Sequence, residues 1–92
     1  MQLMRQQLDE VVHVLREMGA RRVLLFGSAA TQPESARDVD VAVEGVPLRR
    51  LLEADARVHD ILRVPTDLVS REESPGFFDL VSRSAKVLYE QG

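Results

Sequence analysis

Residues 38–44 read DVDVAVE, and no other stretch of the chain constrains the architecture more tightly. Its acidic and apolar positions alternate, which is the period of a β-strand with one face in a core and the other facing solvent. The three valines are therefore predicted to point into the core, while Asp38 and Asp40 share the opposite face. Gly45 is expected to end this strand.

Upstream, residues 23–28 read VLLFGS. The continuous apolar run predicts a short strand that is buried on both faces. Gly27-Ser28 follows it directly and is expected to open one or two helical turns over residues 28–32, which a proline then stops. Residues 33–37 are expected to form a loop that leads back to the acidic strand.

Farther out, helical and strand periods alternate along the chain. Apolar residues spaced by three and four predict a helix over residues 2–18, and Gly19 stands where a C-cap glycine belongs. Phe77-Phe78 are expected to supply one core and one exposed aromatic side chain. The remaining predicted elements are a helix over 47–62 that begins at Pro47, a strand over 64–70, a helix that opens at Ser74-Pro75, and a strand over 86–89. This order predicts an α/β (α+β) fold, with a small mixed β-sheet of about four strands and helices packed mainly on one face.

The bulk properties bound the class of protein. The length of 92 residues fits a single domain over residues 1–92, and 45% hydrophobic and 29% charged residues are ordinary for a globular protein. No apolar run approaches the ~20 residues that cross a bilayer, and the first residues lack a signal-peptide layout, so a cytoplasmic protein without a membrane span is expected. The absence of cysteine excludes disulfides and thiolate chemistry. A net charge of −3 argues against a broad grip on duplex DNA, although bound Mg²⁺ can supply the positive charge that a nucleotide needs.

The aspartates of the acidic strand are candidate metal ligands. A rise of ~3.3 Å per residue puts Asp38 and Asp40 roughly 6–7 Å apart on one face, from which they can flex to bridge two metal ions ~3.5–4 Å apart. Oxygen ligands, with no cysteine and no convincing histidine pair nearby, favour Mg²⁺ or Mn²⁺ over Zn²⁺. Asp67 joins them as a third carboxylate if its strand lies beside theirs. The alternative is that these side chains belong to a solvated strand face and a loop cap.

Gly27 and Ser28 form a candidate phosphate site. Backbone N–H groups at the start of a helix and the serine hydroxyl can bind phosphate oxygens, and glycine allows close approach. Nine residues separate Ser28 from Asp38, which is enough for a helical turn and a loop that return the chain to the metal site. A Gly-Ser pair after a strand is by itself usually a plain turn. Its combination with the aspartates is far more specific.

Three motifs together resemble the DNA polymerase beta-type nucleotidyltransferase superfamily, and in length and order its minimal nucleotidyltransferase (MNT) branch. They are residues 24–28 (LLFGS), 38–41 (DVDV) and 66–69 (TDLV). Residues 86–90 (KVLYE) also resemble the end of such proteins, so the similarity covers nearly the whole chain. The resemblance implies a nucleotidyltransferase-like fold and two-metal transfer of a nucleoside monophosphate, with AMP from ATP expected, to a hydroxyl of a protein or RNA.

The resemblance also implies roles for single residues. Gly27 and Ser28 are expected to hold the β- and γ-phosphates of a nucleoside triphosphate. Asp38 and Asp40 are expected to bind the triphosphate-associated Mg²⁺, and with Asp67 a second ion. The expected partner is an all-helical HEPN protein of a toxin–antitoxin pair, or a second copy of the chain, because so small a domain has little surface left to enclose the base or recognise the acceptor.

The sequence departs from the family pattern directly after the Gly-Ser pair. Many relatives carry an arginine there, whereas this chain has Ala29 and Ala30. Arg37 precedes Asp38, but adjacent strand positions point to opposite faces, so it is not expected to replace the missing cation. Two hypotheses therefore stay open: an active nucleotidyltransferase, and a binding module with a weak or inactive site that neutralises its partner by occlusion.

Overall fold

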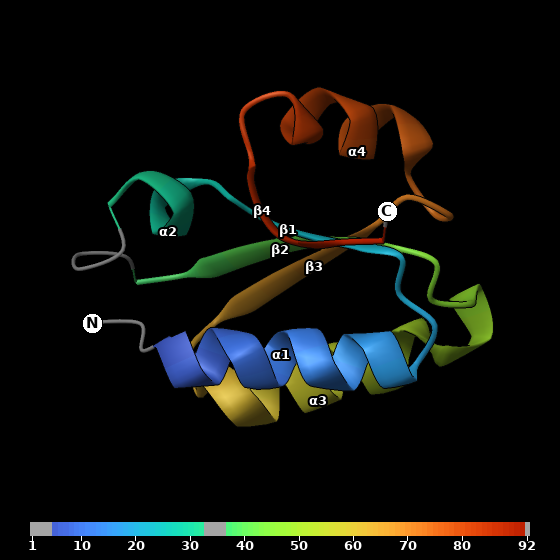
Figure 1. The fold of residues 1–92 in the computed structure, drawn as a ribbon, viewed down its shortest axis with the longest axis horizontal. Helices are drawn as coiled ribbons and strands as arrows, with labels where there is room; N and C mark the ends of the chain where they lie inside the picture. Colours follow the sequence, from blue (N-terminus) through green and yellow to red (C-terminus); the bar gives the residue numbers. More distant parts are fainter. Residues whose placement is uncertain (1–4, 33–36, 92) are drawn as a thin grey trace.

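The computed structural model describes residues 5–32 and 37–91 (Figure 1). Its elements, in chain order, are α1 (Arg5–Glu17), β1 (Arg22–Phe26), α2 (Ser28–Thr31), β2 (Val39–Glu44), the 3₁₀ turn η1 (Leu48–Arg50), α3 (Leu51–Leu62), β3 (Thr66–Ser70), α4 (Pro75–Ser82) and β4 (Lys86–Glu90). The predicted order of helices and strands is confirmed. Residues 2–4 of the first predicted helix and residues 33–36 of the predicted loop lie outside the described residues. Within the described ranges, no helix is both long and apolar enough to cross a bilayer.

Two boundaries differ from the prediction for local reasons. The helix expected to begin at Pro47 starts as the turn η1, and α3 follows it. Pro47 has an extended backbone (φ −58°, ψ 143°), so it stands before the first turn and not inside it. Asp38 lies in a bend, so β2 begins one residue later than expected.

The four strands form one sheet in the order β3-β2-β1-β4. β1 is antiparallel to β2 and to β4, whereas β2 and β3 run parallel, so the sheet is mixed as predicted. Parallel neighbours need a crossover connection, and α3 supplies it. The position of β1 inside the sheet explains its apolar run, because Val23 and Leu25 face one core and Leu24 faces another.

Helices cover the two faces of the sheet unequally. α1 and α3, the two longest, lie side by side beneath one face in Figure 1 and enclose the main core with the three valines of β2, which point inward as predicted. α4 covers the other face, where Phe78 packs on Leu24 and Ala42. The expectation of helices mainly on one face holds for the longest two. α4 lies opposite because β1 and β2 also present apolar side chains there.

Ion pairs close one end of the sheet. Glu44, the last residue of β2, has carboxylate oxygens 3.4 Å from guanidinium nitrogens of Arg21 and Arg22 and 3.9 Å from one of Arg71. Arg22 also lies 3.3 Å from Glu90, so it links β1 to both of its neighbours. The other end of the sheet, where β1 ends and where β2 and β3 begin, holds the predicted site residues.

Candidate active site

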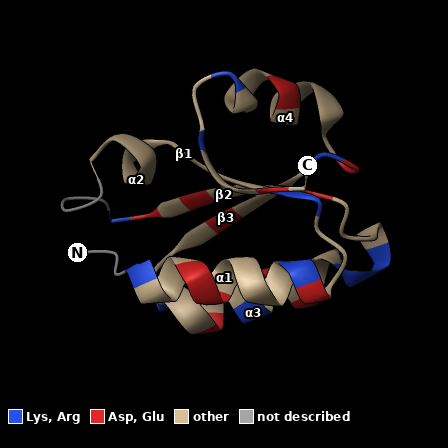
Figure 2. Cartoon of the chain, in the orientation of Figure 1, with Lys and Arg blue, Asp and Glu red and all other residues tan. Residues whose placement is uncertain are grey.

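Two acidic side chains stand next to each other where β2 and β3 begin. Asp40 and Asp67 are direct partners in the parallel register. Paired residues of neighbouring strands point to the same face, and such strands lie about 4.8 Å apart. Figure 2 shows the acidic positions of β2 and β3 close together at this end of the sheet. The strand that carries Asp67 therefore does adjoin the strand that carries Asp40, which the sequence could state only as a condition.

Asp40 is the electrostatic centre of this group. Its side chain is half-buried, whereas Asp38 and Asp67 are exposed. Partial burial raises the pKa of Asp40 above its ordinary value of 3.8, and the negative charges of Asp67 and then Asp38 raise it further. Asp40 is therefore close enough to Asp67 and to Asp38 to be repelled by both. A cation placed among them would relieve that repulsion.

The donor set suits a hard divalent cation. It consists of carboxylate oxygens, the ligands that Mg²⁺ and Mn²⁺ prefer. Among residues 5–32 and 37–91, no three acidic or histidine side chains are already arranged as a closed metal site. Asp40 and Asp67 are adjacent, and Asp38 has to turn inward from its bend to join them. The structure thus brings two of the predicted ligands together and leaves the third within electrostatic range.

Gly27 brings the Gly-Ser turn against the carboxylates. Its backbone (φ 70°, ψ −155°) lies in a region that only glycine adopts without strain. A Cβ at this position would overlap Oδ2 of Asp40, so the backbone of the turn approaches the carboxylate directly. The contact follows from the antiparallel register, in which Phe26, the residue before the turn, pairs with Asp40. The candidate phosphate site and the candidate metal site are therefore neighbours.

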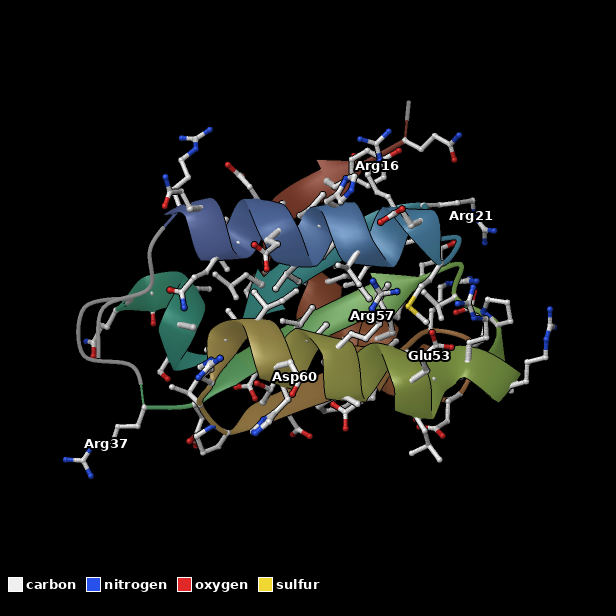
Figure 3. The ribbon with its side chains drawn as sticks, turned by 90° about the horizontal axis from the view of Figure 1, so that it is seen from below. Arg16, Arg21, Arg37, Glu53, Arg57 and Asp60 are labelled. Carbon is white, nitrogen blue, oxygen red and sulfur yellow. The ribbon has the colours of Figure 1, made fainter. Side chains whose placement is uncertain are left out.

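The turn continues into α2, which begins at Ser28. Gly27 and Ser28 are exposed, and the first N–H groups of any helix lack acceptors within it. Ala29 points the other way, because its side chain is only 1% exposed and belongs to the main core. The position after the Gly-Ser pair therefore contributes a small core side chain here and no cation. Arg37 extends away from the protein in Figure 3, as expected for a residue that does not replace the missing cation.

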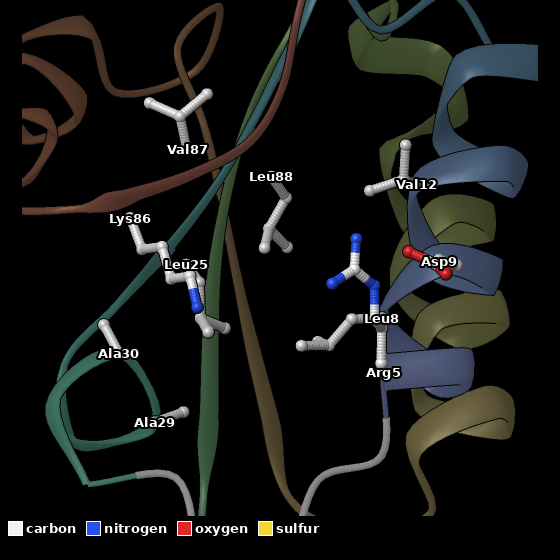
Figure 4. Close-up of a pocket in the computed structure, with 10 residues that line it drawn as sticks. All are labelled: Arg5, Leu8, Asp9, Val12, Leu25, Ala29, Ala30, Lys86, Val87 and Leu88. Carbon is white, nitrogen blue, oxygen red and sulfur yellow. The ribbon is translucent and has the colours of Figure 1, made fainter.

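A cavity of about 400 Å³ lies apart from the carboxylates, between α1, α2 and β4 (Figure 4). Its lining is mixed, with apolar side chains such as Leu8, Leu25 and Leu88 beside the charged side chains of Arg5, Asp9 and Lys86. Leu25 faces the main core, so the cavity opens on the face of the sheet opposite to Asp40. The candidate site is assigned to the carboxylates because they, and not the cavity, carry the groups that can hold a metal ion.

One residue beside the carboxylates was not expected from the sequence. Phe26 was predicted only as the end of a buried strand, yet the register places it next to Asp40, and it packs against the smaller core. Its alternation with Leu24 would have indicated this face only if the order of the strands were known. The prediction for the aromatic pair on α4 is confirmed, since Phe78 is 1% exposed and Phe77 is 48% exposed.

Comparison with known proteins gives matches among solved structures. No family model matches the sequence, and no curated protein matches it. A structure described as a putative minimal nucleotidyltransferase is 28% identical, with a TM-score of 0.73 and 88% of each chain covered. A toxin–antitoxin structure with AMP-PNP is 19% identical, with a TM-score of 0.76 over 91% of this chain and 73% of that one. A tri-AMPylated Shewanella oneidensis HEPN toxin in complex with an MNT antitoxin gives 22% identity and a TM-score of 0.71 over 95% of this chain and 72% of that one.

The fold of this chain is that of nucleotidyltransferases. Within that class, the chain has the architecture of a minimal nucleotidyltransferase domain. The resemblance that its three motifs carry is thereby confirmed at the level of the fold.

Proposed function

We propose that this chain is a Mg²⁺-dependent nucleotidyltransferase that moves a nucleoside monophosphate, AMP from ATP, to a hydroxyl group of a protein or RNA. The observation that carries the proposal is the in-register pair of Asp40 and Asp67, with Asp40 lying against the turn at Gly27. Three separate segments of the chain meet there, and each contributes a group suited to a metal-bound triphosphate. The similarity to structures described as a putative minimal nucleotidyltransferase and as a toxin–antitoxin with AMP-PNP supports it.

The aspartates and the Gly-Ser turn would bind different parts of the substrate. Asp38, Asp40 and Asp67 would hold Mg²⁺ or Mn²⁺, which neutralises phosphate charge and lowers the pKa of the attacking hydroxyl when bound. The missing Cβ of Gly27 lets the turn lie against Asp40. The hydroxyl and N–H of Ser28 would donate hydrogen bonds to a phosphate oxygen held beside the metal ion.

The reaction depends on how the triphosphate and the acceptor are positioned more than on reactive side chains. The oxygen of the acceptor hydroxyl forms a bond to the α-phosphorus, the bond from the α-phosphorus to the bridging oxygen breaks, and pyrophosphate leaves. The hydroxyl proton passes to solvent. No protein nucleophile takes part, so the chain contributes by holding the triphosphate in line with the acceptor and by offsetting charge.

A HEPN-type protein is the partner we propose. Similar structures are described as MntA–HepT complexes and as a tri-AMPylated HEPN toxin with an MNT antitoxin. Most of the site residues are exposed, namely Gly27, Ser28, Asp38 and Asp67. Another chain can therefore reach the site, present the acceptor hydroxyl and help to enclose the base. A second copy of this chain is the other candidate for that role.

A binding module with a weak or inactive site is the alternative function. Two observations favour it: Ala29 is buried where many relatives carry an arginine, and Arg37 points away from the carboxylates. The side chains around the turn thus add little positive charge for a triphosphate. Under this alternative the chain neutralises its partner by covering it, and the aspartates are dispensable for that effect.

Label transfer separates the two functions. The chain is incubated with its co-purified partner, each labelled nucleoside triphosphate and Mg²⁺ or Mn²⁺, and both chains are then weighed by mass spectrometry. We expect metal-dependent addition of AMP by the parent and none by the double variant Asp38→Asn/Asp40→Asn. Glu10→Gln/Asp60→Asn, which also removes two negative charges but from exposed positions on α1 and α3, is the matched control and should keep full transfer. If the parent transfers nothing while the double variant still neutralises the partner, the binding module is correct.

A further inference from the structure

The row of side chains that contains the two carboxylates continues onto β1. Asp67 pairs with Asp40, and Asp40 pairs with Phe26, so the three side chains lie in one line across three strands on one face of the sheet. The ring of Phe77, from α4, meets that of Phe26 edge to face, with centroids 6.3 Å apart and planes at 78°. An acidic pair and an aromatic pair therefore adjoin each other.

Phe77 is not needed for the core of the protein. Phe78, its neighbour in sequence, fills the space between α4 and the sheet and is 1% exposed. Phe77 leaves 48% of its surface in contact with solvent. The exposed part of this ring is open to a ligand that lies beside the acidic pair.

The position of the ring selects the kind of ligand. In the proposed function, the phosphates lie at Gly27-Ser28 and the metal lies at the carboxylates, so the polyphosphate is already accounted for. The nucleoside is the part of the substrate that still lacks a binding surface. Its base is a flat aromatic ring, and such rings stack on phenylalanine with little regard to which base it is.

Resting on the proposed function, we infer that Phe77, supported edge-on by Phe26, is the platform on which the nucleobase of the bound triphosphate stacks. α2 and α4 both lie above the sheet in Figure 1, so a triphosphate anchored at the start of α2 can extend over the carboxylates toward α4. Stacking without hydrogen bonds to base edges gives modest selectivity. Purine triphosphates, which offer more ring surface, should bind better than pyrimidine triphosphates, and ATP and GTP should differ little.

A comparison of two ligands tests the platform. Calorimetric titration with Mg²⁺–ATP and with Mg²⁺–tripolyphosphate, which lacks the nucleoside, is carried out on the parent, Phe77→Ala, Phe77→Trp and Leu80→Ala. Loss of the stacking surface should make Phe77→Ala bind ATP roughly tenfold more weakly, which is about 1.4 kcal/mol, while tripolyphosphate should bind equally well. Phe77→Trp should restore ATP binding. In label transfer, Phe77→Ala should raise the KM for ATP and leave kcat unchanged.

Leu80→Ala is the matched control, because Leu80 is an exposed apolar residue (59% exposed) on the same helix. It should leave both affinities unchanged. The platform is overturned if Phe77→Ala binds ATP as the parent does, if it loses affinity for both ligands equally, or if Leu80→Ala weakens ATP binding as much. The last outcome indicates a general apolar surface for a protein partner. If the parent binds neither Mg²⁺–ATP nor Mg²⁺–tripolyphosphate, the proposed function itself is refuted. This outcome differs from those that overturn the platform alone.

Discussion

Replacement of Gly27 by alanine tests the junction between the turn and the carboxylates. The backbone at Gly27 (φ 70°, ψ −155°) costs a residue with a Cβ about 1–3 kcal/mol. The added methyl also overlaps Oδ2 of Asp40, and moving that carboxylate off its preferred rotamer costs about 1 kcal/mol more. We expect Gly27→Ala to lower the free energy of unfolding by about 2–4 kcal/mol, and to lower Tm on the order of 10–30 °C in a domain of this size.

A double-mutant cycle with Asp40→Ala isolates the contact from the backbone strain. Without the Asp40 carboxylate the methyl group has room, so Gly27→Ala should then cost only the strain, and the coupling energy should be about 1 kcal/mol. Gly76→Ala is the control, because a Cβ at Gly76 meets no atom within 4 Å. It should leave stability unchanged or slightly raised.

Urea unfolding followed by circular dichroism is the suitable assay, since the chain has no tryptophan. Equal losses for Gly27→Ala with and without the Asp40 side chain would show that turn and carboxylate do not touch. If Gly27→Ala lowered the free energy of unfolding no more than Gly76→Ala does, the strained backbone at Gly27 would be refuted as well. Either result removes the geometric link between the candidate phosphate and metal sites.

Three further predictions follow from burial and charge. Because the folded-state pKa of Asp40 is raised, the parent loses stability as the pH rises from 3.8 through the folded value. Asp40→Asn should therefore be more stable than the parent at neutral pH and lose this advantage below pH 3.8, as thermal melts across pH would record. Phe78→Ala removes a fully buried ring and should cost about 3–5 kcal/mol in urea unfolding, whereas Phe77→Ala should cost about 1 kcal/mol, and equal costs would contradict the assignment of core and surface. Glu44→Gln weakens the ion pairs with three arginines and should lower stability by about 1 kcal/mol, with the difference from the parent shrinking in high salt when Tm is measured against ionic strength.

Local patterns predicted the elements well. Alternation in residues 38–44 and the apolar run of residues 23–26 each report the surroundings of one strand, so β1 and β2 could be placed without knowledge of their neighbours. The same holds for Phe77 and Phe78, because adjacent helix positions cannot both face one core. Arg37 points away from the carboxylates, but it lies in a bend and not in the strand whose alternation the prediction used.

Pairing between strands could not be predicted, because it depends on residues far apart in the chain. The sequence could state only that Asp67 joins the site if its strand adjoins β2. Asp67 is set against Asp40 by the β2–β3 register, and Phe26 is set on the other side of Asp40 by the β1–β2 register, and neither register can be read from a single segment. The role of α4 on the second face was missed for the same reason, since the apolar character of Leu24 and Ala42 does not reveal which helix covers them.

The place of β3 at the margin of the sheet has a consequence for the lifetime of the site. Among the strands of the described residues, β3 pairs only with β2, so it is easier to detach than the strands inside the sheet. Each detachment carries Asp67 away from Asp40 while the rest of the protein stays folded. An ion bound by both carboxylates would therefore hold β3 against β2. Because such an ion would arrive with the triphosphate, bound substrate would determine how long β3 stays paired.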